Sequence, residues 1–233
     1  MNKRQPIHPL ISAALFIVLA LVVLMPLTTL SSQLNPAALV VRPSGQVATG
    51  DACPTPATSA DYKHVQAAID CAADGDTIAV YPGTYAERAD NRPEFGTGPG
   101  DYSFGLYIVK NNLRIQGVDE NGVPVNAFGQ VRAIINSQVA SSFGVQGVFI
   151  SGANVTLSGL RINPHGTGDN KTLEIVGDNF TLRHSHITSG GGSALYFRDA
   201  RFVGNATSGT STLKRFAVSG NLLDGGSVVL TNG

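Results

Sequence analysis

The stretch GANVTL at residues 152–157 recurs as GDNFTL at residues 177–182, so the two copies start 25 residues apart. Apolar residues outside the copies keep the same spacing, with Ile162 matched by Ile187. A fixed period of about 20 to 30 residues, rich in strand formers, glycine and asparagine, is typical of stacked, similar coils. The repeat therefore predicts a parallel β-solenoid of about six coils.

Composition favours the same class of fold. The chain has 233 residues, zero net charge and 27 glycines, and only 14% of its residues are charged. This length suffices for one domain with a sizeable core. Low charge and many glycines favour an all-β domain with tight turns, and zero net charge gives no basic field to attract nucleic acid.

The first 30 residues have the pattern of an export segment. Lys3, Arg4 and His8 precede an uncharged apolar run at 10–30, which is long enough to cross a bilayer as a helix of about 20 residues. The segment is either a cleaved signal peptide or an uncleaved signal-anchor that binds the membrane. In both cases we expect the rest of the chain to be extracytoplasmic, either membrane-anchored or secreted.

Cys53 and Cys71 are the only cysteines, and both follow the apolar run. An even number of cysteines in an exported chain favours a disulfide between them. The alternative is two buried thiols. No Cys or His partners stand at zinc-ligand spacing, so we expect no metal there.

The remaining chain divides into a linker and a domain. Residues 31–58 are rich in Ser, Pro, Ala and Thr without periodicity, which predicts a linker before a domain at 59–233. A short helix is expected at 61–73, and a buried strand at 76–81. The helix carries one apolar stripe, formed by Val65, Ala68, Ile69 and Ala72. Laid over the first coil, it would cover the open strand edges there.

The run from Val65 through Gly75-Asp76-Thr77-Ile78 to Pro82-Gly83-Thr84-Tyr85 resembles the opening of many pectate-lyase-like proteins. The resemblance implies a right-handed parallel β-helix with an N-terminal capping α-helix, here preceded by the transmembrane or signal helix. It implies little about activity, because pectate and alginate lyases, pectin esterases, phage tailspikes and many surface proteins are similar in this region.

An asparagine row is the first set of candidate residues. Asn112, Asn154 and Asn179 precede strands at corresponding points of their coils. Asparagine tolerates the left-handed conformation of a sharp turn, and stacked amides can bond one another, so we expect a structural row. The alternative is N-glycosylation, because Asn154, Asn179 and Asn205 each begin a sequon.

A second row is expected on the outer face of the coils. Alternation along the strands should point Arg161 outward, with His186 stacked beside it and Asn221 as a weaker third member. In the lyases that the sequence resembles, a basic residue on such a face removes the proton α to a uronate carboxylate. The alternative is a solvated polar face. Further candidates and nearby cations are His184, His165, Arg183 and Arg198.

Residues 86–105 interrupt the repeat with acids, arginines and aromatic rings, a mixture suited to holding a sugar chain. The alternative is a loop that packs over the coil with its aromatic rings as anchors. The candidates for substrate binding are Glu87, Arg88, Arg92 and Tyr102.

The catalytic carboxylates of the similar enzymes have no counterpart that the sequence can place. The acids after residue 170 are Glu174, Asp178, Asp199 and Asp224, and none are adjacent. We therefore identify no cofactor, and we expect Ca²⁺ only if the chain is a lyase. The paired acids of a β-helix glycoside hydrolase are also missing.

The favoured hypothesis is an extracytoplasmic scaffold that binds glycans or other partners. The alternative is a polysaccharide-degrading enzyme, either a uronate lyase acting by β-elimination or a glycoside hydrolase, of which this chain carries the first coils. The sequence ends at 231–233 just after a predicted strand, without a helix to cover the last coil. We therefore expect a truncated product, or a partner at that end of the domain.

Overall fold

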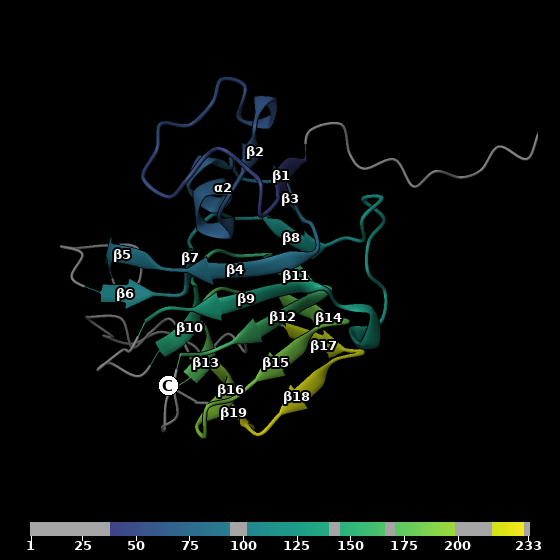
Figure 1. The fold of residues 1–233 in the computed structure, drawn as a ribbon. Helices are drawn as coiled ribbons and strands as arrows, with labels where there is room; N and C mark the ends of the chain where they lie inside the picture. Colours follow the sequence, from purple (N-terminus) through teal and green to yellow (C-terminus); the bar gives the residue numbers. More distant parts are fainter. Residues whose placement is uncertain (1–37, 94–101, 140–144, 166–170, 199–215, 231–233) are drawn as a thin grey trace, which may run out of the picture. The chain divides into compact units, whose positions relative to one another are not determined.

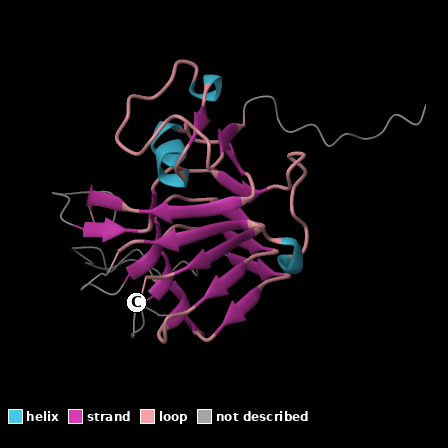
Figure 2. Ribbon diagram, in the orientation of Figure 1, coloured by secondary structure: helices cyan, strands magenta, loops and turns pink. Residues whose placement is uncertain are grey.

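The computed structural model describes residues 38–93, 102–139, 145–165, 171–198 and 216–230. They form three parallel sheets, a two-stranded antiparallel hairpin and one short α-helix (Figures 1 and 2). The predicted export segment at 1–30 lies outside the described residues. Within these ranges, no helix has both the length and the apolar character needed to cross a membrane.

Each parallel sheet collects strands that lie far apart along the described chain. Sheet 1 has the spatial order β17-β14-β11-β8-β3-β1-β2, sheet 2 the order β19-β16-β13-β10-β7, and sheet 3 the order β18-β15-β12-β9-β4. The strands of sheet 1 are β1 (Leu39–Val41), β2 (Asp61–Tyr62), β3 (Thr77–Val80), β8 (Arg114–Gly117), β11 (Thr156–Ser158), β14 (Phe180–Arg183) and β17 (Phe216–Ser219). Those of sheet 2 are β7 (Leu106–Ile108), β10 (Val145–Ile150), β13 (Lys171–Ile175), β16 (Ser193–Phe197) and β19 (Ser227–Leu230). Those of sheet 3 are β4 (Gly83–Glu87), β9 (Ala133–Ser137), β12 (Leu160–Asn163), β15 (His186–Thr188) and β18 (Leu222–Asp224).

From β7 onward the described strands visit the sheets in a fixed order. One strand lies in sheet 2, the next in sheet 1 and the next in sheet 3, and this circuit is made four times before β19 enters sheet 2 again. Each circuit therefore places its strands beside those of the circuit before it.

The sequence repeat sets the register between the circuit β10–β12 and the next circuit, β13–β15. Leu157 pairs with Leu182 in sheet 1, and Ile162 pairs with Ile187 in sheet 3. These partners are 25 residues apart, as the two sequence copies are. The prediction that equivalent residues lie side by side on parallel strands is confirmed.

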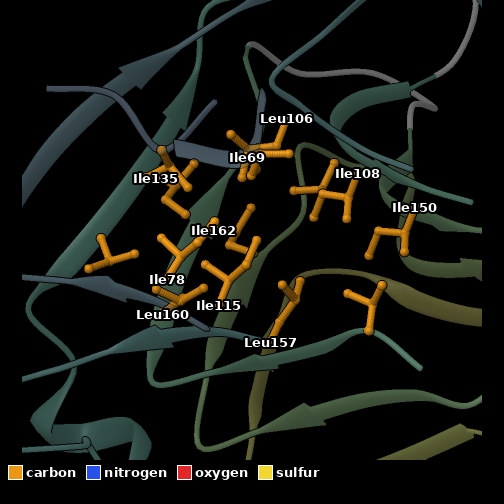
Figure 3. Packing of buried hydrophobic residues seen from close by; sticks show 14 of the residues in the cluster. Ile69, Ile78, Leu106, Ile108, Ile115, Ile135, Ile150, Leu157, Leu160 and Ile162 are labelled. Carbon is orange, nitrogen blue, oxygen red and sulfur yellow. The ribbon is translucent and has the colours of Figure 1, made fainter. Parts of the chain in front are cut away.

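Apolar side chains from all three sheets meet in one buried cluster (Figure 3). Ile115 of sheet 1, Ile108 of sheet 2 and Ile162 of sheet 3 are each fully buried. Burying such a side chain contributes about 1.5 to 3 kcal/mol, so the repeated inward positions supply most of the driving force for folding. The alternate positions are left on the outer faces, where a site can form.

The helix α2 (Val65–Cys71) is shorter than the predicted 61–73. Asp61–Tyr62 form strand β2 instead, and His64 at the helix start makes no capping hydrogen bond with its side chain. The side chain of Glu87 caps the helix, because its two carboxylate oxygens accept hydrogen bonds from the backbone N–H groups of Val65 (2.7 Å) and Gln66 (3.1 Å). The helix start is therefore fixed by a strand residue that is distant in sequence.

Gln66 joins α2 to the free edge of sheet 2. Its side-chain oxygen accepts a hydrogen bond from the backbone N–H of Tyr107 (2.8 Å), and its Nε2 donates to the backbone oxygen of Tyr107 (3.3 Å). Tyr107 lies on β7, the edge strand, so the amide occupies the place of a further strand. This contact satisfies backbone groups that an edge would otherwise expose.

Part of the predicted linker belongs to the sheets. Strand β1 lies within 31–58 and pairs with both β2 and β3, while Leu39 and Val41 are fully buried. Residues 57–59 form a single 3₁₀ turn, η1 (Ala57–Ser59). The strand Leu39–Val41 is only three residues long, too short to show the alternation that marks a strand.

The predicted loop at 86–105 contains a hairpin. Strands β5 (Ala89–Arg92) and β6 (Tyr102–Phe104) pair antiparallel, and residues 94–101 between them lie outside the described ranges. The ring of Phe104 stacks with those of Tyr107 (5.5 Å between centroids) and Phe149 (5.1 Å) on the outer face of sheet 2. These rings anchor the hairpin, as the packing alternative predicts.

The last described circuit presents apolar side chains to solvent. Phe216 on β17 and Val228 on β19 are 43% and 48% exposed. Residues 231–233 lie outside the described ranges, so a partner or a further segment at this end stays a prediction.

Candidate functional site

The asparagine row forms the turn between sheets 2 and 1. Asn112, Asn154 and Asn179 have φ values of 56°, 58° and 57°, in the left-handed region. The side-chain nitrogen of Asn154 donates to the oxygen of Asn112 (2.8 Å), and that of Asn179 donates to Asn154 (2.7 Å). The structural prediction is confirmed. A glycan on Asn154 or Asn179 would attach to a nitrogen already engaged in this ladder, and Asn205 lies outside the described residues.

The last three described turns from sheet 1 to sheet 3 use two glycines and one histidine. Gly159 and Gly220 have positive φ values of 64° and 63°, and His184, at the equivalent position between them, has φ 51°. A left-handed residue with a Cβ costs about 1 kcal/mol relative to glycine. Gly220 makes room for the imidazole, because a Cβ built there would lie 2.8 Å from Cδ2 of His184.

A loop packs against the same turn and creates a pocket. The backbone N–H of Val125 donates to the oxygen of Gly117 (3.0 Å), and a Cβ on Gly159 would lie 2.9 Å from Cβ of Val125. The loop between β8 and β9, which includes the 3₁₀ turn η2 (Phe128–Gln130), can approach this closely because position 159 is glycine. Glycine at 117 instead leaves room for the backbone of Gly159 on the neighbouring strand.

The pocket has a volume of about 270 Å³ and lies on the outer face of β8, β11 and β14. The loop supplies one wall, and the turn at His184 supplies part of another. The residues that line it are Arg114, Gln116, Pro124, Val125, Asn126, Thr156, Ser158, Arg183 and His184.

Cations and neutral polar groups dominate the pocket. Arg114 and Arg183 line it together with His184, and none of the lining residues is an acid. Neither arginine forms an ion pair with a described residue, whereas Arg42 and Arg92 each pair with a nearby aspartate. Unpaired guanidinium groups beside hydroxyl and amide groups form a surface suited to an anionic, hydroxyl-rich ligand.

The predicted outer row is present in part. Arg161 pairs in register with His186 on sheet 3, and both are half-buried. His186 pairs next with Leu222, not with Asn221. The oxygen of Asn221 accepts from the backbone N–H of Ser185 (2.8 Å), and its nitrogen donates to the oxygen of Leu182 (2.9 Å), so this residue stabilises a turn.

The other nearby cations separate onto different faces. Arg183 and His184 belong to the pocket, while Nε of Arg198 lies 2.7 Å from the buried carboxylate of Glu174 on sheet 2. His165 is exposed at the end of a described stretch. The expected cluster of cations is therefore divided between the pocket, the outer row and an ion pair.

Three of the four candidates from 86–105 are engaged in other contacts, and the fourth lies beside the aromatic cluster. Glu87 is fully buried against α2, so its carboxylate cannot reach a sugar in solvent, and that prediction is corrected. Nε of Arg88 lies 2.8 Å from Asp90, and Arg92 lies 2.6 Å from Asp70 on the helix. Tyr102 packs against the aromatic cluster that holds the hairpin.

Two titrating groups in this region are shifted by their neighbours. A hydrogen bond with Glu87 raises the pKa of His64, at the start of α2. Hydrogen bonds from Ser103 and Arg88 lower the pKa of Asp90. In both cases the hydrogen bond favours the charged form of the group, so the charged form in turn favours the folded helix start and hairpin.

Cys53 and Cys71 form the predicted disulfide, which ties the segment before β2 to the end of α2. In the described part of the chain, no three His, Cys, Asp or Glu side chains gather to hold a metal ion.

Arg114, Gln116 and Asn126 were missed by sequence reasoning. Arg114 and Gln116 follow Asn112 by two and four residues, as Thr156 and Ser158 follow Asn154. Aligning the sequences of successive circuits on their asparagines would therefore have identified the outward positions of sheet 1. No local pattern marks Asn126, because its place depends on how the loop packs.

Searches against protein-family models, curated proteins and solved structures found no match to this chain. The resemblance to pectate-lyase-like proteins therefore stays a prediction that is based on the sequence.

Proposed function

We propose that this protein is an extracytoplasmic, right-handed parallel β-helix that binds an acidic glycan through the pocket on sheet 1. The observation that carries the proposal is the pair Arg114 and Arg183, which line one pocket without an acid among its lining residues. In a chain of zero net charge, two arginines in one hollow without an acidic partner among the described residues are an unusual concentration of cation.

The helical arrangement and the location have separate support. Three sheets visited in fixed order around one apolar core fit successive turns of a β-helix, with α2 as the cap of the first turn. The Cys53–Cys71 disulfide favours an oxidising compartment outside the cytoplasm.

The chemistry of the pocket favours a carboxylate or sulfate group on a sugar. A guanidinium presents paired N–H donors that match the two oxygens of such a group. Thr156, Ser158 and Asn126 add hydroxyl and amide groups that can bond sugar hydroxyls. A neutral glycan would leave both arginines without a counter-ion.

Titration calorimetry with polygalacturonate, alginate and neutral dextran tests the proposal. We expect binding of the acidic polymers that weakens with added salt, and no binding of dextran. Arg183→Gln should weaken binding about tenfold, since a charged hydrogen bond contributes about 1.5 kcal/mol or more. Arg88→Gln, a change of equal charge on the hairpin, is the matched control. Equal affinity of the Arg183→Gln variant and the original chain would contradict the proposal.

One observation supports the enzymatic alternative, a uronate lyase. Nε2 of His186 lies 3.7 Å from the carboxylate of Asp224, and Arg161 is its register neighbour. A carboxylate that orients a histidine beside an arginine could assist proton removal next to a uronate. The appearance of the ultraviolet absorbance of an unsaturated uronate during incubation with alginate or polygalacturonate, and its loss in His186→Gln, would favour this function over binding alone.

A further inference from the structure

We infer that the ligand is a linear acidic polysaccharide that crosses the corner between sheets 1 and 3 and places its next anionic group on Arg161 and His186. The inference rests on the proposed function, because it extends the same site. Its basis is the order of side chains around the corner. Arg183 is exposed on sheet 1, His184 forms the turn and lines the pocket, and His186 is on the outer face of sheet 3.

The two groups of cations are close along the chain. Arg183 and His186 are three residues apart, so their Cα atoms are separated by at most about 11 Å. Ser185, between the corner and His186, is fully buried and points away from this surface. The outward side chains therefore form a short path from the pocket to the outer face of sheet 3.

The arginines along this path lack acidic partners. Among described residues, Arg114, Arg161 and Arg183 form no ion pair, and Nε of Arg161 donates only to the side-chain oxygen of Asn163 (3.2 Å). Four of the five described arginines outside the path are instead paired with acids, at Arg42–Asp61, Arg88–Asp90, Arg92–Asp70 and Arg198–Glu174. The fifth, Arg132, donates to the backbone oxygens of Gly129 and Val131. Three of the four described guanidinium groups that form no ion pair thus lie along this path.

The acids near the path do not neutralise its three arginines. Asp224 faces His186 but is 63% exposed and belongs to β18. Asp119 lies in the loop that forms one wall of the pocket. Its carboxylate accepts hydrogen bonds from the backbone N–H groups of Asn121 and Val123 in the same turn. Glu120 beside it is exposed. None of these acids forms an ion pair with the three arginines.

A single carboxylate cannot occupy both the pocket and the far side of a turn. A polymer with repeated charges can, and its second contact then forms at a high effective concentration. The structure therefore points to a polymeric ligand whose affinity increases with chain length beyond one sugar.

Titration of the full-length chain with galacturonate and with trigalacturonate tests this directly. Arg161→Gln and His186→Gln should each weaken binding of trigalacturonate about tenfold while leaving that of galacturonate unchanged. Arg183→Gln should weaken both, because it removes the pocket contact. Arg88→Gln, on the hairpin, should weaken neither. A chondroitin sulfate tetrasaccharide and its sulfated monosaccharide form a parallel arm, which distinguishes sulfate from carboxylate as the anion.

Each result decides between the two proposals. If trigalacturonate and the sulfated tetrasaccharide bind no more tightly than their monosaccharides, or if Arg161→Gln and His186→Gln leave oligomer binding intact, the crossing of the corner is refuted while the pocket remains. If no acidic sugar of any length binds, the proposed function fails as well. Two variants on different strands guard against the case in which one of them fails to fold.

Discussion

Replacing Glu87 with glutamine should remove the main polar anchor of α2. The side chain is fully buried, with Oε1 2.7 Å from the backbone nitrogen of Val65 and Oε2 3.1 Å from that of Gln66. Glutamine has nearly the same shape but only one acceptor oxygen. Its NH₂ group would face one of these N–H donors, leaving two buried donors without an acceptor.

The expected cost follows from these contacts. A buried polar group without a partner costs about 1 to 3 kcal/mol, and loss of a negative charge at a helix start costs about 0.3 to 1 kcal/mol. Burial of a neutral amide is less costly than burial of a carboxylate, which offsets part of the loss. We therefore expect Glu87→Gln to lower the free energy of unfolding by about 3 kcal/mol.

Equilibrium unfolding in urea measures this change, and hydrogen exchange at the amides of Val65 and Gln66 reports the anchor itself. Glu120→Gln makes the same acid-to-amide change at an exposed position and should cost under about 0.5 kcal/mol. If Glu87→Gln matches this control in urea, and exchange at both amides is not accelerated, the assignment of Glu87 as the helix anchor is wrong.

Four further predictions concern other contacts. Asn154→Ala should destabilise the fold by about 1 kcal/mol more than Asn154→Gly, since both lose the ladder but only glycine keeps the left-handed turn without strain; urea midpoints that coincide would contradict this. Cys53→Ser should cost about 3 kcal/mol, the loop-closure value for a separation of 18 residues, and a reductant should destabilise the original chain equally. The raised pKa of His64 implies a stabilisation that is present below the unfolded pKa near 6.5 and is lost as pH rises through the folded pKa. The stability difference between the original chain and His64→Gln should therefore shrink from about pH 5.5 to about pH 8 in urea titrations. His184→Gly should raise stability by about 1 kcal/mol and weaken acidic-glycan binding, whereas a gain without loss of binding would exclude His184 from the site.

The arrangement of the strands could be predicted because one period carries both the inward side chains and the turn residues. Leu157 and Leu182 mark the buried positions, and Asn154 and Asn179 mark the turn, so two independent patterns agree on the same 25-residue spacing. Where the chain leaves this period, as at the three-residue strand β1, local sequence was insufficient.

The site was predicted less well, because it depends on contacts between circuits. Arg161 and His186 follow from strand alternation, but Arg114 joins Arg183 only because their strands lie in one sheet beneath the same loop. Glu87 resembled an exposed acid in a polar loop, and only the helix above it explains its burial. Charge alone therefore does not separate a binding residue from a structural one.

The shared 25-residue register also determines which insertions and deletions this architecture can tolerate. Excision of residues 152–176 would remove β11, β12 and β13 together, one strand from each sheet, and bring β8 beside β14 with Ile115 next to Leu182. Loss of a single residue within a strand would instead turn its apolar side chains toward solvent. Homologues of this chain should therefore gain or lose whole circuits of three strands. Insertions and deletions of other lengths should occur in the loops between strands.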